Sequence, residues 1–224
     1  MAKRNKNQFD FAAFVKELSQ NQTERSTETQ AERQYFLIVC EGEKTEPNYF
    51  NSLIDTLPPD LVKVEIIGEG TNTIDVVEKG IELRDKRKEE VLQPPFDEVW
   101  AVFDKDDFPN ERFNAAVTLG EQEQIHTAYS NEAFELWYIL HFQLLDSAIS
   151  RSVYIDILKG ILGNYQKNDE SIYQRLQEEG NEEQAIKHAK HLLETLAEGN
   201  PAIEKPTTKV HQLVGRLNEF KPID

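Results

Sequence analysis

Acidic residues stand at the ends of two of the most apolar segments of this sequence. Glu41 directly follows the run YFLIVC, Asp104 closes the run EVWAVFD, and Asp106 lies two residues further on. If the two runs are neighbouring strands of a parallel sheet, their carboxyl ends bring the three carboxylates to the edge where α/β proteins bind ligands. Carboxylate oxygens are suitable ligands for Mg²⁺ or Mn²⁺, which also keep water and substrate phosphate as ligands.

A cluster of this kind predicts metal-dependent chemistry at a phosphate. One or two bound ions polarise a phosphoryl oxygen and generate a hydroxide nucleophile from water. Lys44, three residues after Glu41, is placed to contact a phosphate beside them. An Asp-x-Asp pair alone is weak evidence in a chain with 41 acidic residues, but its combination with a second strand-end carboxylate is more specific.

Other residues capable of chemistry are interpreted as structural. Glu43 and Glu46 are expected to be solvated loop carboxylates. His141 lies in an apolar helical run and is expected to be a hydrogen-bonded core residue. His188 and His191 are three residues apart on a polar helix without further ligands nearby, which favours a solvated helix face over a metal site.

The segments that must position these residues alternate between strand and helix patterns. Four apolar runs with β-branched members predict strands, at residues 35–40, 62–67, 98–104 and 124–130. Helical patterns follow them, at residues 47–57, 73–92, 110–119 and 134–142. The alternation predicts an α/β fold: a parallel sheet of about four strands flanked by helices on both faces.

Three parts of the chain differ in pattern. Residues 1–32 are polar, with a possible short helix and a linker of low hydrophobicity. Residues 33–150 carry the alternating strands and helices and are expected to form the α/β domain. Residues 151–224 contain four helical patterns and no recognisable strand, so they predict a helical C-terminal extension packed on that domain.

Composition and charge limit the function classes. The single cysteine, Cys40, cannot form an internal disulfide and is expected to be a small buried hydrophobe. No apolar stretch reaches the length of a membrane helix, and no secretory signal is recognisable, so we expect a cytoplasmic protein without membrane contact. The net charge of −16 argues against binding nucleic acid by electrostatics alone and leaves room for a partner with a basic surface.

Four segments resemble a known family. The Glu-Gly after the first predicted strand and the Asp-x-Asp after the third are similar to the Toprim domain of topoisomerases, primases and OLD-type nucleases. More narrowly, the chain resembles the RloB-like family, a Toprim offshoot of prokaryotic defence and restriction-associated loci. The segments are IVCEGEKTEPNYF (38–50), VWAVFDKDDF (99–108), SNEAFELWYILHF (130–142) and TTKVHQLV (207–214).

The resemblance implies roles for individual residues. Asp104 and Asp106 match the Asp-x-Asp metal ligands, and Glu41 matches a residue that binds metal or transfers a proton. Glu135 matches the glutamate of a Ser-Asn…Phe-Glu motif and is a further ligand or positions water. The sequence departs from the family pattern at Glu132, where proline is expected.

The last segment of the resemblance adds two weaker candidates, Lys209 and His211, as substrate-binding residues. Together these matches imply a Toprim-like fold. They also imply a Mg²⁺- or Mn²⁺-dependent nuclease that cuts DNA or RNA as an effector of anti-phage defence, by abortive infection, beside an AAA/ABC-type ATPase.

Three alternatives stay open at this point. One is a catalytically idle Toprim-like toxin or regulatory subunit that binds an ATPase. Another is a phosphatase of the haloacid-dehalogenase type, although its Asp-x-Asp ends the first strand rather than the third. The last is topoisomerase or primase chemistry, which needs further domains.

Overall fold

The structure is a computed structural model that describes residues 33–68, 72–195 and 199–222. The helix and linker predicted within residues 1–32 lie outside the described residues. Residues 33–224 form one compact unit. No described helix has the length and apolar composition that crossing a membrane requires.

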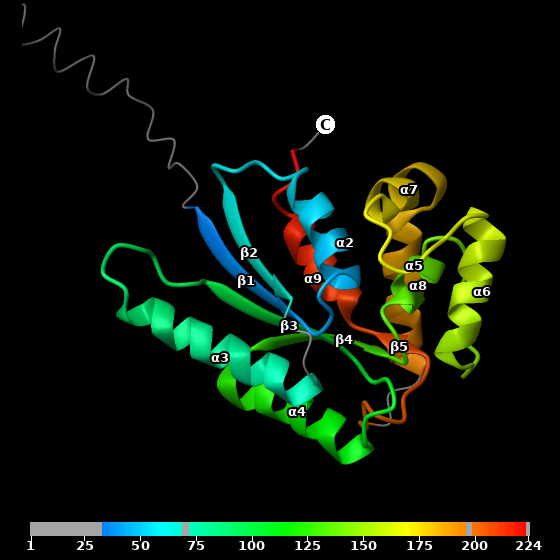
Figure 1. The fold of residues 1–224 in the computed structure, drawn as a ribbon, viewed down its shortest axis with the longest axis horizontal. Helices are drawn as coiled ribbons and strands as arrows, with labels where there is room; N and C mark the ends of the chain where they lie inside the picture. Colours follow the sequence, from blue (N-terminus) through cyan, green and yellow to red (C-terminus); the bar gives the residue numbers. More distant parts are fainter. Residues whose placement is uncertain (1–32, 69–71, 196–198, 223–224) are drawn as a thin grey trace, which may run out of the picture. The chain divides into compact units, whose positions relative to one another are not determined.

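A five-stranded sheet forms the centre of this unit, and its strand order is β2-β1-β3-β4-β5 (Figure 1). The first four strands are parallel, as predicted, and the fifth is antiparallel to β4. The strands are β1 (Gln34–Cys40), β2 (Val62–Gly68), β3 (Glu98–Asp104), β4 (His126–Asn131) and β5 (Thr207–Thr208).

Eight helices are present in the described part of the chain, and their bounds agree with the predicted helices to within a few residues. The helices are α2 (Thr45–Ile54), α3 (Thr73–Glu89), α4 (Asn110–Glu123), α5 (Glu135–Leu140), α6 (Arg151–Leu162), α7 (Ile172–Glu179), α8 (Glu182–Thr195) and α9 (Val210–Asn218). The predicted α/β class is confirmed.

Side chains alternate across each buried strand, and this alternation creates a hydrophobic core on each face of the sheet. Leu37 and Val39 of β1 point into the core that α3 and α4 cover. Phe36, Ile38 and Cys40 point into the larger core, which α2 and α5–α9 cover. Figure 1 shows the sheet between these two helical layers. The predicted burial of Cys40 is confirmed.

One expectation about the C-terminal part of the chain was wrong. No strand was predicted after residue 151, but Thr207 and Thr208 pair with Asn131 and Ser130 and add β5 to the edge of the sheet. Two residues are too few to show the alternation that identifies a strand in sequence. The hydroxyl groups of Ser130 and Thr208 also form a hydrogen bond of 3.0 Å. The C-terminal part of the chain is therefore joined to the sheet itself.

Candidate active site

The strand order reverses direction between β1 and β3, and a cleft of about 430 Å³ opens at their carboxyl ends. β2 lies on one side of β1, whereas the chain after β2 returns to form β3 on the other side. Such a reversal separates the connecting loops and leaves room for a ligand. The cleft is lined by Glu41, Gly42, Glu43, Lys44, Thr45, Glu46, Asp104, Asp106, Phe134, Glu135, Lys167 and Asn168.

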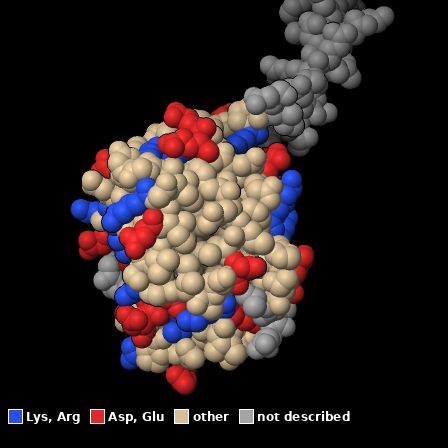
Figure 2. Space-filling view, turned by 90° about the vertical axis from the view of Figure 1, so that its right-hand side faces the viewer, with Lys and Arg blue, Asp and Glu red and all other residues tan. Residues whose placement is uncertain are grey.

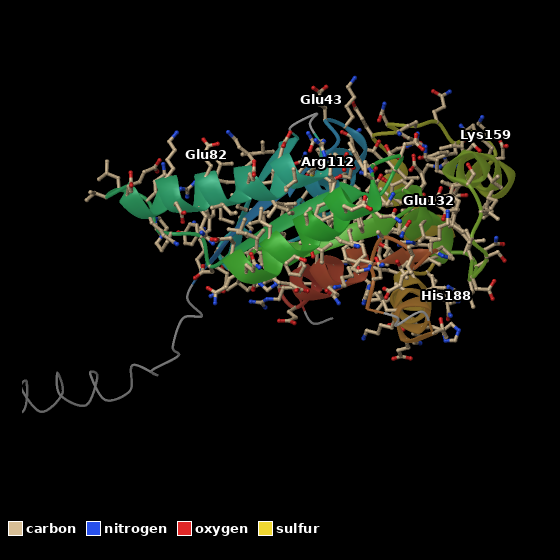
Figure 3. The ribbon with its side chains drawn as sticks, turned by 90° about the horizontal axis from the view of Figure 1, so that it is seen from below. Glu43, Glu82, Arg112, Glu132, Lys159 and His188 are labelled. Carbon is tan, nitrogen blue, oxygen red and sulfur yellow. The ribbon has the colours of Figure 1, made fainter. Side chains whose placement is uncertain are left out.

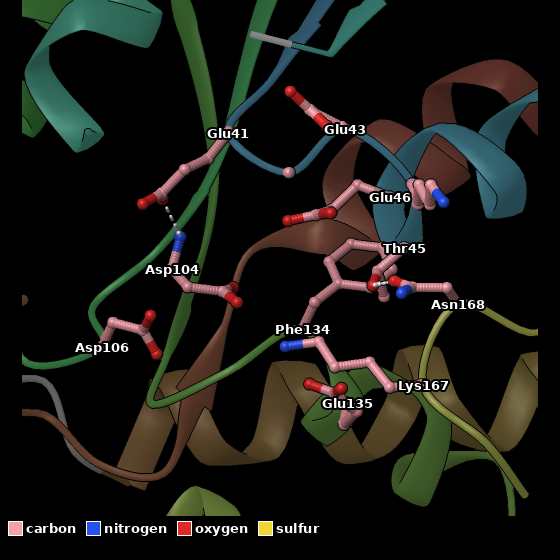
Figure 4. Close-up of a pocket in the computed structure, with 12 residues that line it drawn as sticks. Glu41, Glu43, Thr45, Glu46, Asp104, Asp106, Phe134, Glu135, Lys167 and Asn168 are labelled. Carbon is pink, nitrogen blue, oxygen red and sulfur yellow. Dashed lines mark hydrogen bonds between the residues drawn. The ribbon is translucent and has the colours of Figure 1, made fainter. Parts of the chain in front are cut away.

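Glu41 and Asp104 are held together by the pairing of β1 with β3. The Glu41 N–H donates to Val102 O at 2.9 Å, and the Glu41 carboxylate accepts a 2.9 Å hydrogen bond from the Asp104 N–H (Figure 4). Burial raises the pKa of Glu41 to about 7, the Asp104 N–H partly offsets this, and the charge of Glu46 raises it further. The predicted neighbourhood of these two strand ends is therefore confirmed.

Asp106 reaches the cleft through a turn that follows strand β3. β3 ends at Asp104, and the backbone of Asp106 then turns into the left-handed region with φ of 44°. Aspartate is one of the few residues that tolerate this conformation. The turn is fixed by hydrogen bonds from the Lys105 N–H to Ser130 O and from the Asp106 N–H to Glu132 O.

The carboxylate of Asp106 already has a cationic partner. The Arg151 guanidinium, from the first turn of α6, forms ion pairs with Asp106 and with the exposed Asp107, the latter at 2.8 Å. Asp106 thus lines the cleft with the other predicted carboxylates, but its charge is neutralised from outside the cleft.

Glu135 enters the cleft from the start of α5. Its side chain is 3% exposed, and its Oε1 is buried without a hydrogen-bond partner among the described residues. The Oδ1 atom of Asp104 is likewise buried without a hydrogen-bond partner among the described residues. A buried, unpartnered carboxylate oxygen costs free energy unless a hydrogen-bond donor or a cation satisfies it. Both atoms therefore fit a site that receives a cation.

The prediction that Glu46 is a solvated loop carboxylate was wrong. Glu46 lies in the first turn of α2 and is 4% exposed. Burial raises its pKa, as does the charge of Glu135, while its own backbone, Lys167 and the Gly42 backbone lower it. The nearby Glu43 is exposed and points away from the other carboxylates, as predicted (Figures 3 and 4).

The position of Glu46 explains the glycine of the Glu-Gly pair. A Cβ atom built on Gly42 would lie 2.2 Å from the Oε2 atom of Glu46, far inside van der Waals contact. A side chain at residue 42 would force the Glu46 carboxylate to move, so glycine leaves room for the carboxylate of α2 beside that of Glu41.

Glu132, the residue at the proline position of the family pattern, ties three segments together. The Asn131–Glu132 peptide bond is cis. The Glu132 carboxylate accepts a hydrogen bond from the Arg151 N–H at 3.3 Å and forms a 2.5 Å ion pair with Lys205. It projects from the segment between β4 and α5 (Figure 3) and thereby supports the entry to Glu135 without lining the cleft.

Two weaker candidates lie elsewhere. Lys209 lines a different cavity and places its ammonium group 5.0 Å from the centre of the Tyr129 ring. His211 lines the groove between α8 and α9, and its Nδ1–H donates to Thr208 O at 3.1 Å. His141 is a buried core residue whose Nδ1–H donates to Trp137 O, as predicted.

The described structure supplies two cleft residues that the sequence did not indicate, Lys167 and Asn168. Both lie in the loop between α6 and α7, and Asn168 accepts a 2.8 Å hydrogen bond from the hydroxyl of Thr45. They are more than 120 residues from Glu41 in the chain, and no strand end or motif marks them.

The buried carboxylates act on one another. The pKa of Asp104 is raised well above its usual value by burial and by the charges of Glu46, Glu135 and Glu41. Within residues 33–68, 72–195 and 199–222, however, no three His, Cys, Asp or Glu side chains are arranged to hold a metal ion as they stand. The donor set nevertheless fits a hard divalent cation in its chemistry, because all of its candidate ligands are carboxylates.

Comparisons with known proteins agree with the resemblance of the sequence segments. Neither the curated proteins nor the solved structures contain a significant match to this chain. A family model described as RloB-like protein matches residues 36–217, which is most of the chain and includes every residue that lines the cleft. The chain therefore belongs to the RloB-like protein family.

Proposed function

We propose that this protein is a Mg²⁺- or Mn²⁺-dependent nuclease that hydrolyses phosphodiester bonds of DNA or RNA. The observation that carries the proposal is the gathering of four carboxylates at the β1/β3 reversal: Glu41, Glu46, Asp104 and Glu135. Burial of several like charges is unfavourable without a cation. In a Toprim-like site, a cation held by such carboxylates would bind the phosphate of a phosphodiester substrate.

Asp104 and Glu135 would hold the metal through their unpartnered buried oxygens, and Glu41 through the oxygen opposite its hydrogen bond. Asp106 would join them when its pairing with Arg151 is released. A bound divalent ion supplies Lewis-acid activation of the phosphate and of the attacking water.

The protein side chains supply proton transfer and orientation. In the metal-free site burial raises the pKa of Glu41 to about 7, so if its free oxygen does not bind the metal, Glu41 would instead accept the proton of the attacking water and return it to the leaving oxygen. The hydrogen bond from the Asp104 backbone keeps the Glu41 carboxylate in one orientation. Buried aromatic contacts beneath the cleft, including Tyr49 against Phe134 at 5.8 Å, hold α2 and α5 in fixed relative positions.

The test is cleavage of labelled single- and double-stranded DNA and RNA by the full-length chain. We expect cleavage with Mn²⁺ or Mg²⁺ and complete loss of cleavage in EDTA, because the carboxylates alone have no means of activating water at a phosphate. Activity that persists in EDTA would contradict the metal mechanism. No cleavage of any substrate would favour a catalytically idle subunit.

Arg151 is expected to compete with the metal for Asp106. In Arg151→Gln the Asp106 carboxylate has lost its guanidinium partner, so we expect Mn²⁺ to bind about three- to tenfold more tightly. Titration calorimetry of the two proteins with Mn²⁺ measures this change. Arg112→Gln, which alters an exposed arginine of α4, is the control and should leave Mn²⁺ affinity unchanged. Equal affinity in Arg151→Gln would remove Asp106 from the metal site.

The setting proposed for this activity is cytoplasmic anti-phage defence in association with an AAA/ABC-type ATPase. The net charge of −16 supports a partner, because the chain has little basic surface of its own to attract nucleic acid. Charged side chains are sparse over the middle of the face viewed from the side of α6 (Figure 2).

A further inference from the structure

The loop between α6 and α7, residues 163–171, is fastened to the helix that carries Glu46. Asn168 accepts a hydrogen bond from the Thr45 hydroxyl through its side chain and another, of 3.2 Å, from the Asn48 amide through its carbonyl. Tyr173, just beyond the loop, packs edge-on against Tyr49 of α2 with ring centroids 5.4 Å apart. The loop is therefore positioned by the same helix that forms one wall of the cleft.

The two ends of the loop are also fixed. Tyr165 is 2% exposed and packs against Tyr138 of α5. At the other end Asp169 accepts hydrogen bonds from the backbone and hydroxyl groups of Ser171, and Arg175 donates to Leu162 O at 2.6 Å. These contacts leave residues 166–168 as a short, supported bridge at the edge of the cleft.

Lys167 extends from this bridge into the cleft. Its side chain points between Glu135 and Asp104 (Figure 4). Its positive charge lowers the pKa of Glu46, yet among the described residues no carboxylate oxygen lies within ion-pair distance of its ammonium group. Arg151 differs, because its guanidinium is already paired with Asp106. Lys167 is thus a cation aimed into the acidic site with its hydrogen-bonding capacity unused.

A second hollow, of about 300 Å³, adjoins the cleft at this bridge. It shares Lys167 and Asn168 with the cleft and is also lined by Asn164, Gln166, Asp169, Ser171 and Arg175. Lys167 therefore stands at the boundary of two adjoining hollows, both with polar linings.

We propose that Lys167 binds a non-bridging oxygen of the phosphodiester held at the carboxylates, so that the α6–α7 loop supplies the phosphate contact of the site. This inference rests on the proposed nuclease function. The acidic cleft would otherwise repel a polyanion, and a lysine that is free to donate three hydrogen bonds offsets that repulsion at the point of reaction. Lys44, the sequence-based candidate for this contact, lines the same cleft but is not required by the proposal.

Lys167→Gln tests the proposal in the full-length protein, with Lys167→Arg as the charge-preserving variant. Lys159→Gln is the matched control, because Lys159 is exposed on α6 and does not line the cleft (Figure 3). Binding is measured with a labelled single-stranded oligonucleotide in Ca²⁺, and cleavage of the same oligonucleotide with Mn²⁺. We expect Lys167→Gln to weaken binding and lower kcat/KM about ten- to a hundredfold, and Lys167→Arg to retain most of both.

The salt dependence of binding gives an independent readout. Loss of one phosphate contact should reduce the slope of log K against log salt by about 0.7 for a single strand. Unchanged affinity and slope in Lys167→Gln would overturn the proposal. Tighter Mn²⁺ binding with unchanged oligonucleotide affinity would also overturn it, because Lys167 would then be only a counter-charge to the carboxylates. If the unaltered protein neither binds nor cuts any oligonucleotide, the proposed nuclease function fails and this inference fails with it.

Discussion

Replacement of Asp104 with asparagine is expected to reduce phosphodiester cleavage about a thousandfold or more, because the variant loses a proposed metal ligand whose buried Oδ1 atom has no other partner among the described residues. Asparagine has nearly the same shape as aspartate, and the Asp104 backbone N–H that binds Glu41 is retained. The charges of Glu46, Glu135 and Glu41 disfavour an ionised Asp104, and the substitution removes this unfavourable charge from the cluster. The folded protein should therefore be as stable as the parent or more stable without metal.

The measurement combines initial cleavage rates in Mn²⁺ with Mn²⁺ binding by calorimetry. Asp156→Asn removes an equivalent carboxylate from the exposed surface of α6 and should leave both quantities unchanged. Asp104→Asn should lose Mn²⁺ affinity together with activity. A variant that binds Mn²⁺ as tightly as the parent, or that cuts at more than about a tenth of the parental rate, would show that Asp104 is not a metal ligand.

Glu41→Gln is expected to have opposite effects on activity and on the stability of the metal-free protein. Activity should be lost, because glutamine can neither carry a proton nor neutralise a cation. Stability should rise above neutral pH, because the buried charge is removed while an oxygen remains to accept the hydrogen bond from the Asp104 N–H.

The pH dependence of this stability difference follows from the direction of the shift. The pKa of Glu41 rises from its ordinary value of 4.5 in the unfolded chain to about 7 in the folded protein, chiefly through burial. The folded state therefore binds the proton more tightly, and the stability that this binding contributes is present below about pH 4.5 and lost as pH rises through about 7. Parent and variant should be equally stable near pH 4.5.

Above about pH 7.5 the variant should exceed the parent by roughly 2 kcal/mol. This is less than the full shift implies, because part of the Glu41 carboxylate contacts solvent. Chemical denaturation in EDTA at several pH values measures the difference. Glu178→Gln, at an exposed position of α7, should show no such growth with pH. A stability difference that is independent of pH, or that favours the parent at high pH, would contradict the proposed burial of this carboxylate.

The stability of the folded protein is expected to depend on whether a divalent cation occupies the carboxylate cluster. If the proposed metal site is correct, the carboxylates that repel one another in the metal-free protein would attract a divalent cation, so added Mn²⁺ and substitution of an acidic residue would relieve the same electrostatic repulsion. Destabilising groups of this kind are retained where function requires them.

Much of the fold and part of the site were predictable from local pattern. Strand β3 was predicted with its observed bounds, because five consecutive apolar residues between Glu98 and Asp104, bounded by turn residues, are typical of a strand buried in a parallel sheet. Glu41 and Asp104 followed from the same reasoning, because residues that end neighbouring parallel strands necessarily lie at one edge. The family could also be identified, because two long and unusual segments surround these carboxylates.

One sequence feature favours a structured position for Glu46. It stands immediately before Pro47 at the start of a helix that directly follows a strand end, and a carboxylate in a first helical turn is favoured by the helix dipole. Its burial was not predictable, because it depends on how α2 packs beside the Glu41 loop, where Gly42 leaves room for the carboxylate.

The remaining features were decided by tertiary structure alone. Lys167 reaches the cleft because packing of α7 on α2 carries its loop there, and no local pattern records that packing. Lys209 and His211 lie elsewhere because β5 pairs with β4 at the sheet edge, away from the β1/β3 reversal. The sequence by itself determined where the strands end and therefore where Glu41 and Asp104 meet. Contacts between distant segments decided which basic side chains lie near these carboxylates, because such contacts depend on the whole core rather than on any one run of residues.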